Sequence, residues 1–204
     1  MAKKFRNKYR IASARAQWWD YGNNGAYFVT ICTHNRLHFF GEIANGQMTL
    51  SKPGKLADTH WHEIPDRFPY AHLGEFIIMP NHIHGIIIID HTNDGDDSDG
   101  VGDGAATRLI ASLPSPNPGP PKSKSPNPPG GITGNKNPML HKNLSRIIRW
   151  YKGRITFEAR KTNPNFEWQT RFHDNIIRDK RAYDNITNYI RNNPGNWPSD
   201  KQNR

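Results

Sequence analysis

A stretch of fifty residues in the middle of the chain sets the first limit on the fold. Between His91 and Leu140 there is no Phe, Trp or Tyr, and the stretch contains the run PSPNPGPPKSKSPNPPGG. Such a segment cannot bury enough apolar area to offset the entropy cost of ordering it, so residues 91–140 are predicted to be a disordered Pro/Gly-rich insertion. The hydrophobic core must then come from residues 19–90 and 141–197, which we expect to be two halves of one domain.

Charge and composition limit the classes of partner. The 204 residues include 28 Lys and Arg against 18 Asp and Glu, a formal net charge of +10. The insertion is nearly neutral, whereas the predicted N-terminal arm, residues 1–18, is basic and contains no acid. A basic surface favours a polyanion such as nucleic acid. We expect no membrane span, and the single cysteine, Cys32, fits a reducing, cytoplasmic location. Residues 198–204 are read as a short tail.

Local sequence patterns predict an α+β fold. The β-branched and aromatic run at residues 26–33 and the apolar runs at 73–79 and 82–90 predict strands, and a weaker β pattern covers 172–178. Helices are predicted at about 54–63, with Pro65 ending that helix, and at 144–157 and 181–192. Together these elements predict a mainly antiparallel sheet with helices packed on it.

A His-Ile-His sequence lies in the strand predicted for residues 82–90. Because side chains alternate along a strand, His82 and His84 leave the same face while Ile83 points to the other. Two imidazoles held close together on a rigid strand suit a divalent metal ion. They equally suit two polar residues on a hydrated sheet face, and the motif alone does not decide between these interpretations.

The predicted C-terminal helix offers further polar side chains. Ala182, Ile186, Tyr189 and Asn193 lie at i, i+4, i+7 and i+11, so Tyr189 and Asn193 project from one stripe. The Asn193 amide oxygen is a candidate metal ligand, and the Tyr189 phenol would lie near whatever that metal polarises. By periodicity alone, a packed tyrosine and a helix-ending asparagine before Pro194 is the favoured interpretation.

Four motifs together resemble a known family. In chain order they are GAYFVTICTHNR (25–36), MPNHIHGIII (79–88), WQTRFHDNIIRD (168–179) and NYIRNNP (188–194). This set closely resembles the HUH single-tyrosine transposases, in particular the REP-associated tyrosine transposases. The resemblance spans residues 19–197 apart from the insertion, and it implies a ferredoxin- or RRM-like HUH domain.

The resemblance also implies a role for each candidate residue. His82 and His84 match the His-hydrophobic-His metal ligands, Tyr189 matches the nucleophile, and Asn193, four positions later, completes the metal site. The implied cofactor is Mg²⁺ or Mn²⁺, which would polarise the scissile phosphate. Tyr189 would form a 5′-phosphotyrosine and release a 3′-hydroxyl, and reversal would rejoin the strands. The implied partner is single-stranded DNA with a hairpin, REP-like structure in a bacterial cytoplasm, and a homodimer is also allowed.

Basic side chains provide candidate DNA contacts, because single-stranded DNA is usually bound by a charged groove with aromatic stacking platforms. Tyr151 is a rival nucleophile, although its place on the apolar stripe of its helix favours packing. The candidate contacts are Arg146, Arg149, Lys152, Arg154, Arg171 and Arg178. Taken singly, each is better explained as a solvated surface cation, so only the set supports the prediction.

Two other functions remain open at this point. A catalytically silent DNA-binding module would keep the fold and the basic surface, but the intact tyrosine, histidines and asparagine argue against it. A zinc hydrolase would also use His-x-His, but the chain is shorter than a typical barrel of about 250 residues. It also lacks an obvious general-base carboxylate beside the motif. The sequence therefore favours a metal-dependent single-strand DNA endonuclease and strand transferase.

Overall fold

The computed structural model describes residues 4–5, 8–9, 19–91, 142–200 and 202–203. Apart from His91, which is ordered and hydrogen-bonds Asn24 and Gly22, the predicted insertion lies outside these described residues, as does most of the predicted N-terminal arm. The strands are β1 (Lys4–Phe5), β2 (Lys8–Tyr9), β3 (Gly25–Cys32), β4 (Gly41–Ala44), β5 (Gln47–Leu50), β6 (Ala71–Met79), β7 (His82–Ile89) and β8 (His173–Ile177). The helices are η1 (His34–Arg36), α1 (Lys52–His62), α2 (Ile64–Arg67), α4 (Leu144–Ala159), α5 (Lys180–Asn192) and η3 (Trp197–Ser199).

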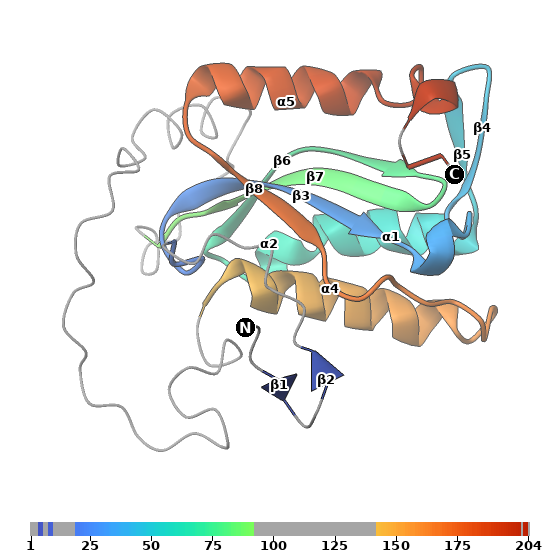
Figure 1. Ribbon diagram of the computed structural model, residues 1–204, viewed down its shortest axis with the longest axis horizontal. Coiled ribbons are helices and arrows are strands. Elements are labelled where there is room, and N and C mark those ends of the chain that lie inside the picture. Colours follow the sequence, from blue (N-terminus) through green and yellow to red (C-terminus); the bar gives the residue numbers. More distant parts are fainter. Residues whose placement is uncertain (1–3, 6–7, 10–18, 92–141, 201, 204) are drawn as a thin grey trace.

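Four antiparallel strands form the central sheet in the order β6-β7-β3-β8. β3 pairs with β7 along its whole length, from Gly25 opposite Ile89 to Cys32 opposite His82. Its other edge pairs with β8, up to Thr30 opposite His173. Figure 1 shows α5 on one face of this sheet and α1, α2 and α4 on the other. The predicted α+β fold, a mainly antiparallel sheet with helices packed on it, is therefore confirmed.

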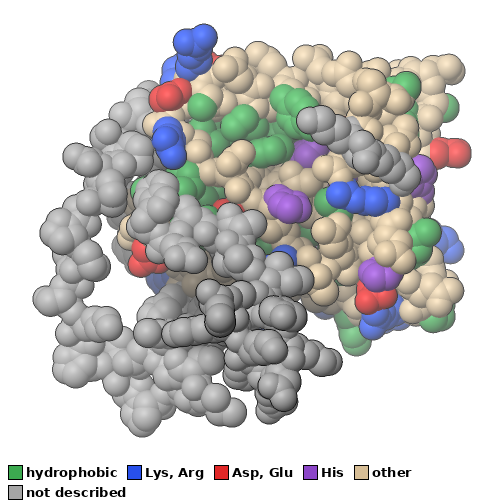
Figure 2. Space-filling view, in the orientation of Figure 1, with side chains coloured by type: hydrophobic (Ala, Val, Ile, Leu, Met, Phe, Trp, Pro, Cys, Tyr) green, Lys and Arg blue, Asp and Glu red, His purple; other side chains and the backbone are tan. Residues whose placement is uncertain are grey.

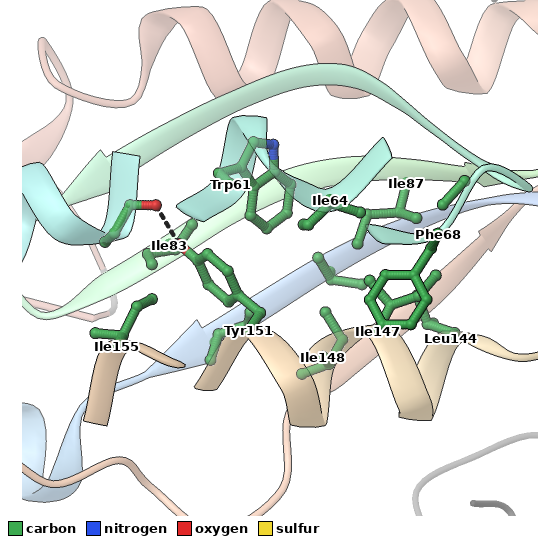
Figure 3. Packing of buried hydrophobic residues seen from close by; sticks show 14 of the residues in the cluster. Trp61, Ile64, Phe68, Ile83, Ile87, Leu144, Ile147, Ile148, Tyr151 and Ile155 are labelled. Atoms are coloured by element: carbon green, nitrogen blue, oxygen red, sulfur yellow. Dashed lines mark hydrogen bonds between the residues drawn. The ribbon is translucent and has the colours of Figure 1, made fainter. Parts of the chain in front are cut away.

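The larger core fills the space between the sheet and helices α1, α2 and α4. The apolar stripe of α4 is buried there, as the labelled side chains in Figure 3 show: Leu144, Ile147, Ile148, Tyr151 and Ile155. Trp61 of α1 stacks on Phe76 with ring centroids 5.3 Å apart. A Cβ atom on Gly85 of β7 would lie 2.2 Å from Trp61, so a glycine at this position permits the close approach.

A smaller cluster joins the other face of the sheet to α5. From the sheet it includes Ile86, Ile88 and Ile177, and α5 contributes the fully buried Ile190. The amphipathic helix α5 therefore packs on a small apolar cluster of the sheet, with Phe28 and Ile77 at its margin. An ion pair between Arg191 and Glu75, 2.7 Å long, also joins the C-terminal end of α5 to β6.

Two local features differ from the sequence-based expectations. The helix predicted at residues 54–63 begins earlier, because the Ser51 hydroxyl accepts a hydrogen bond from Gly54 N and caps the first turn. Pro65 does not end this helix: α1 ends at His62, and Pro65 lies in the first turn of α2, where a missing N–H costs nothing. Among the described residues, no helix is long and apolar enough to cross a membrane.

Candidate active site

Strand β7 brings both predicted metal-ligating histidines onto the face of the sheet that α5 covers. His82 and His84 are buried, and their ring centroids lie 4.5 Å apart. Ile86 and Ile88, two and four residues further along, point to the same face and join the cluster under α5. The chemistry-bearing residues therefore share one side of a strand that is buried along its whole length.

The hydrogen bonds of Asn81 determine the tautomer of His82. The Asn81 Nδ2 group donates to the carbonyl oxygens of Arg36 and Gln202, at 3.2 and 2.7 Å. Its Oδ1 atom must then be the acceptor that faces His82 Nδ1 at 2.8 Å, so Nδ1 carries the hydrogen. The lone pair of His82 is consequently on Nε2, which is buried and has no hydrogen-bond partner.

His84 is held between a threonine and the candidate nucleophile. Its Nδ1 lies 2.9 Å from Thr30 Oγ1, and its Nε2 lies 3.2 Å from the Tyr189 hydroxyl. Burial lowers the pKa of His84 to about 4. Burial, assisted by the neighbouring His84, lowers the pKa of His82 to about 2. Both imidazoles are therefore neutral at pH 7, the form in which histidine binds a metal.

Helix α5 places Tyr189 and Asn193 at its C-terminal end, beside the histidines. Tyr189 is 47% exposed, and its ring meets Phe28 edge-on at 6.1 Å. Burial raises the pKa of Tyr189 above its usual value of 10, although a hydrogen bond with Asn193 opposes this shift. Asn193 follows the last residue of α5 and is buried, and its Oδ1 has no hydrogen-bond partner.

These donors fit a divalent metal ion. The described part of the chain contains no group of three or more His, Cys, Asp or Glu side chains that could hold a metal, so the candidate set is two imidazoles and one amide. His82 Nε2 and Asn193 Oδ1 are both buried acceptors without a partner. Leaving buried acceptors unpaired is costly, and a cation bound between them would satisfy both.

Five of the six predicted DNA-contacting residues fall into two groups. Arg146, Arg149 and Arg154 line a groove of about 380 Å³ on α4, together with Phe68 and Trp150. Figure 1 shows α4 and α5 on opposite faces of the sheet, so this groove lies on the side of the sheet away from α5. The other group lies at the two ends of β8, where Arg171 and Arg178 are exposed.

On α4, Tyr151 is buried and Lys152 beside it is partly buried. The Lys152 ammonium donates to the carbonyl oxygens of Gln169 and Arg171, at 2.7 and 3.0 Å, and burial lowers its pKa to about 8. The hydroxyl of Tyr151 donates to the Ala57 carbonyl at 2.8 Å, and the residue is fully buried. Lys152 thus holds the segment before β8, and Tyr151 is a core residue, as its helical register indicated.

Four residues near the candidate site were not singled out from the sequence. They are Asn81 and Thr30, which hydrogen-bond the histidines, and Phe28 and Trp197, whose rings lie against them. The position of Asn81 directly before His82 was a signal that sequence reasoning could have used. Thr30 is recognisable only once the β3–β7 register is known, because it lies opposite His84.

Comparisons with known proteins place the chain among its relatives. No family model matches it. In structure, it matches a REP-associated tyrosine transposase bound to a REP hairpin, with a TM-score of 0.50 and 14% identity, over 91% of this chain and 73% of that one. This similarity supports a transposase-like fold. In sequence, it is 34% identical over 192 residues to a Haemophilus influenzae protein described as uncharacterized, covering 93% of this chain and 91% of that protein. The chain therefore belongs to the same family as this H. influenzae protein.

Proposed function

We propose that the protein is a transposase-like enzyme that cleaves and rejoins single-stranded DNA through Tyr189. The observation that carries the proposal is the contact of the Tyr189 hydroxyl with His84 Nε2, at 3.2 Å, beside two buried acceptors that lack partners. These groups come from both predicted halves of the domain, β7 from the first and α5 from the second. The similarity in fold to a tyrosine transposase supports the same conclusion.

The neighbouring side chains determine which nitrogen of each candidate histidine ligand carries a lone pair. A Mg²⁺ or Mn²⁺ ion bound by His82, His84 and Asn193 would supply stabilisation of the negative charge on the scissile phosphate. Asn81 holds the His82 lone pair on Nε2, and Thr30 does the same for His84 if it accepts the Nδ1 hydrogen. The Nε2 lone pair of His84 serves one partner at a time, so its bond to Tyr189 and metal binding exclude each other.

In this proposal Tyr189 acts as the nucleophile. Its oxygen would attack phosphorus, the bond from phosphorus to the 3′ oxygen would break, and the product would be a 5′-phosphotyrosine. The raised pKa keeps the phenol protonated at neutral pH, so its proton must leave during attack. Water can accept it because nearly half of the side chain is exposed, and the leaving 3′ oxygen takes up a proton to become a hydroxyl. Attack by a 3′-hydroxyl reverses these changes and rejoins the strands.

The proposed substrate is single-stranded DNA that carries a hairpin. The structural neighbour is described as bound to a REP hairpin, and the net charge of +10 suits a nucleic acid. A strand at Tyr189 lies across the sheet from the arginine groove of α4. We therefore assign Arg146, Arg149 and Arg154 to a part of the DNA away from the cleaved phosphate, and Arg171 and Arg178 to the strand near it.

A labelled single-stranded DNA from the chromosomal surroundings of the gene tests the proposal. It is incubated with Mg²⁺ or Mn²⁺ and with wild-type protein, Tyr189→Phe or Tyr151→Phe, and covalent adducts are separated on a denaturing gel. We expect an adduct with wild type and with Tyr151→Phe, the matched control, and none with Tyr189→Phe. An adduct that persists in Tyr189→Phe contradicts the nucleophile assignment. DNA binding without an adduct in all three proteins favours the catalytically silent DNA-binding module.

A further inference from the structure

The edge strand β8 presents an alternating row of polar side chains. His173 and Asn175 are exposed, as is Arg171 two residues before His173, whereas Asp174 and Ile176 between them are partly buried. Because side chains alternate along a strand, His173 and Asn175 share one face of the sheet, and Arg171 is exposed just before the strand begins. They combine a guanidinium, an imidazole and an amide, which are groups that bind phosphate oxygens and base edges.

The strand register places this row beside the candidate active site. His173 lies opposite Thr30, and Thr30 lies opposite His84, so the three side chains form a line across β8, β3 and β7 on the same face. Neighbouring strands are about 4.8 Å apart, which puts His173 about 10 Å from His84. That is about three stacked nucleotides at about 3.4 Å each.

Helix α5 leaves this end of β8 uncovered. Ile177, at the C-terminal end of the strand, is buried in the cluster with Ile190 of α5, but exposure increases toward His173. Figure 2 shows histidine side chains exposed in the middle of the view, with hydrophobic side chains beside them. Tyr189 is 47% exposed and His173 and Asn175 are exposed, so a DNA strand can reach these side chains from solvent.

The backbone before β8 is held in place by several hydrogen bonds. Lys152 donates to the Gln169 and Arg171 carbonyls, and Gln169 N donates to the Cys32 carbonyl at 2.9 Å. Arg171 has a φ of 69°, a left-handed conformation that is strained for a non-glycine residue. Strained residues fixed by their surroundings are concentrated at functional sites.

We propose that Arg171, His173 and Asn175 form a nucleotide-binding strip that holds the DNA strand next to the phosphodiester presented to Tyr189. The strip rests on the proposed function and extends it, because it assigns His173 and Asn175 to substrate binding. The row contains no carboxylate, and the carboxylate of Asp174 lies on the other side of the strand. The strip contacts nucleotides, whereas Tyr189, His82 and His84 contact the reacting atoms.

Binding in the absence of metal tests the strip without requiring catalysis. The full chain is titrated into a fluorescein-labelled oligothymidylate of about 12 nucleotides with EDTA present, and fluorescence anisotropy is recorded. We expect His173→Ala/Asn175→Ala to raise the dissociation constant at least about tenfold, because the variant removes both side chains that the strip contributes from β8. His62→Ala, which removes an exposed histidine from α1, is the matched control and should bind like wild type.

A second variant distinguishes a loss of DNA binding from a folding defect. Asn175→Asp keeps the size of the side chain and adds a negative charge, so it should weaken binding as well. No measurable binding by wild type, or equal binding by wild type and both strip variants, overturns the strip. If the strip variants lose binding but wild type forms no adduct with any DNA, the proposed catalysis fails and the strip stands. An adduct that depends on Tyr189 together with unchanged binding by the strip variants overturns the strip alone.

Discussion

The two faces of the central sheet differ in what they contain. The face toward α1, α2 and α4 is filled by large apolar and aromatic side chains such as Trp61, Tyr151 and Phe76. The face toward α5 has a small isoleucine cluster at one end and histidines at the other. Buried acceptors without partners, at His82 and Asn193, lie on this second side.

This difference indicates that one face of the sheet contributes mainly to stability and the other mainly to the candidate site. Burial of apolar area contributes most of the folding free energy, so the first face can be expected to carry the stability of the domain. Unpaired buried polar atoms lower stability, and proteins commonly retain them where they bind a ligand. Such atoms also occur on the other face, at Trp61 and His60, but on the α5 face they adjoin the candidate nucleophile, so that face is the candidate binding face. The following predictions test this difference between the faces.

The largest expected effect is on the stability of the first face. Trp61→Ala removes a fully buried indole that packs on Phe76 and Tyr151, so the free energy of unfolding should fall by about 3–5 kcal/mol. Tyr189→Phe should change it by less than about 0.5 kcal/mol, because this half-exposed side chain loses only a hydroxyl. Urea denaturation followed by circular dichroism measures both. Similar losses of unfolding free energy in the two variants would contradict this difference between the faces.

A smaller effect is expected at the residue that orients His82. Asn81→Ala removes the acceptor that holds hydrogen on His82 Nδ1, so Mn²⁺ affinity, measured by calorimetry on the full chain, should fall about 10–100-fold. Asn81→Asp keeps an acceptor at this position and should retain more of the affinity than Asn81→Ala. Equal Mn²⁺ affinity in wild type and Asn81→Ala would show that the hydrogen bond does not prepare the ligand.

The smallest effect concerns competition at His84. Because the Tyr189 hydroxyl and a metal compete for one lone pair, Tyr189→Phe should raise Mn²⁺ affinity by up to about fivefold, the equivalent of a hydrogen bond of about 1 kcal/mol. Tyr151→Phe, whose lost hydroxyl lies in the core, should leave the affinity unchanged. A lower affinity in Tyr189→Phe would instead identify the phenol oxygen as a ligand.

Elements with a strong repeating pattern were predicted from the sequence. The apolar stripe of residues 144–157 predicted α4, and the apolar run at residues 82–90 predicted a strand, which is β7. The hairpin of β4 and β5 was missed, although Asn45 and Gly46, with φ values of 52° and 72°, form the Asn-Gly turn that favours such hairpins. Its strands are only four residues long, too short for a clear alternation.

The candidate site could be predicted only in part. Alternation along one strand placed His82 and His84 together, and the helical repeat joined Tyr189 to Asn193, so each pair depended on local geometry alone. Bringing the two pairs together depends on how α5 packs across β6, which periodicity does not specify. The same holds for Thr30 and His173, whose relation to His84 follows from strand register between distant segments.

The alternation of β7 also limits how this gene can change in length. Histidines at positions 82 and 84 face α5, while Ile83 and Gly85 face the core and Trp61. Inserting one codon between Ile83 and His84 would exchange the two sides for every residue on one side of the insertion, placing a histidine in the core or isoleucines in the site. Inserting two codons would preserve the sides. Surviving length variants of this strand should therefore differ by even numbers of residues.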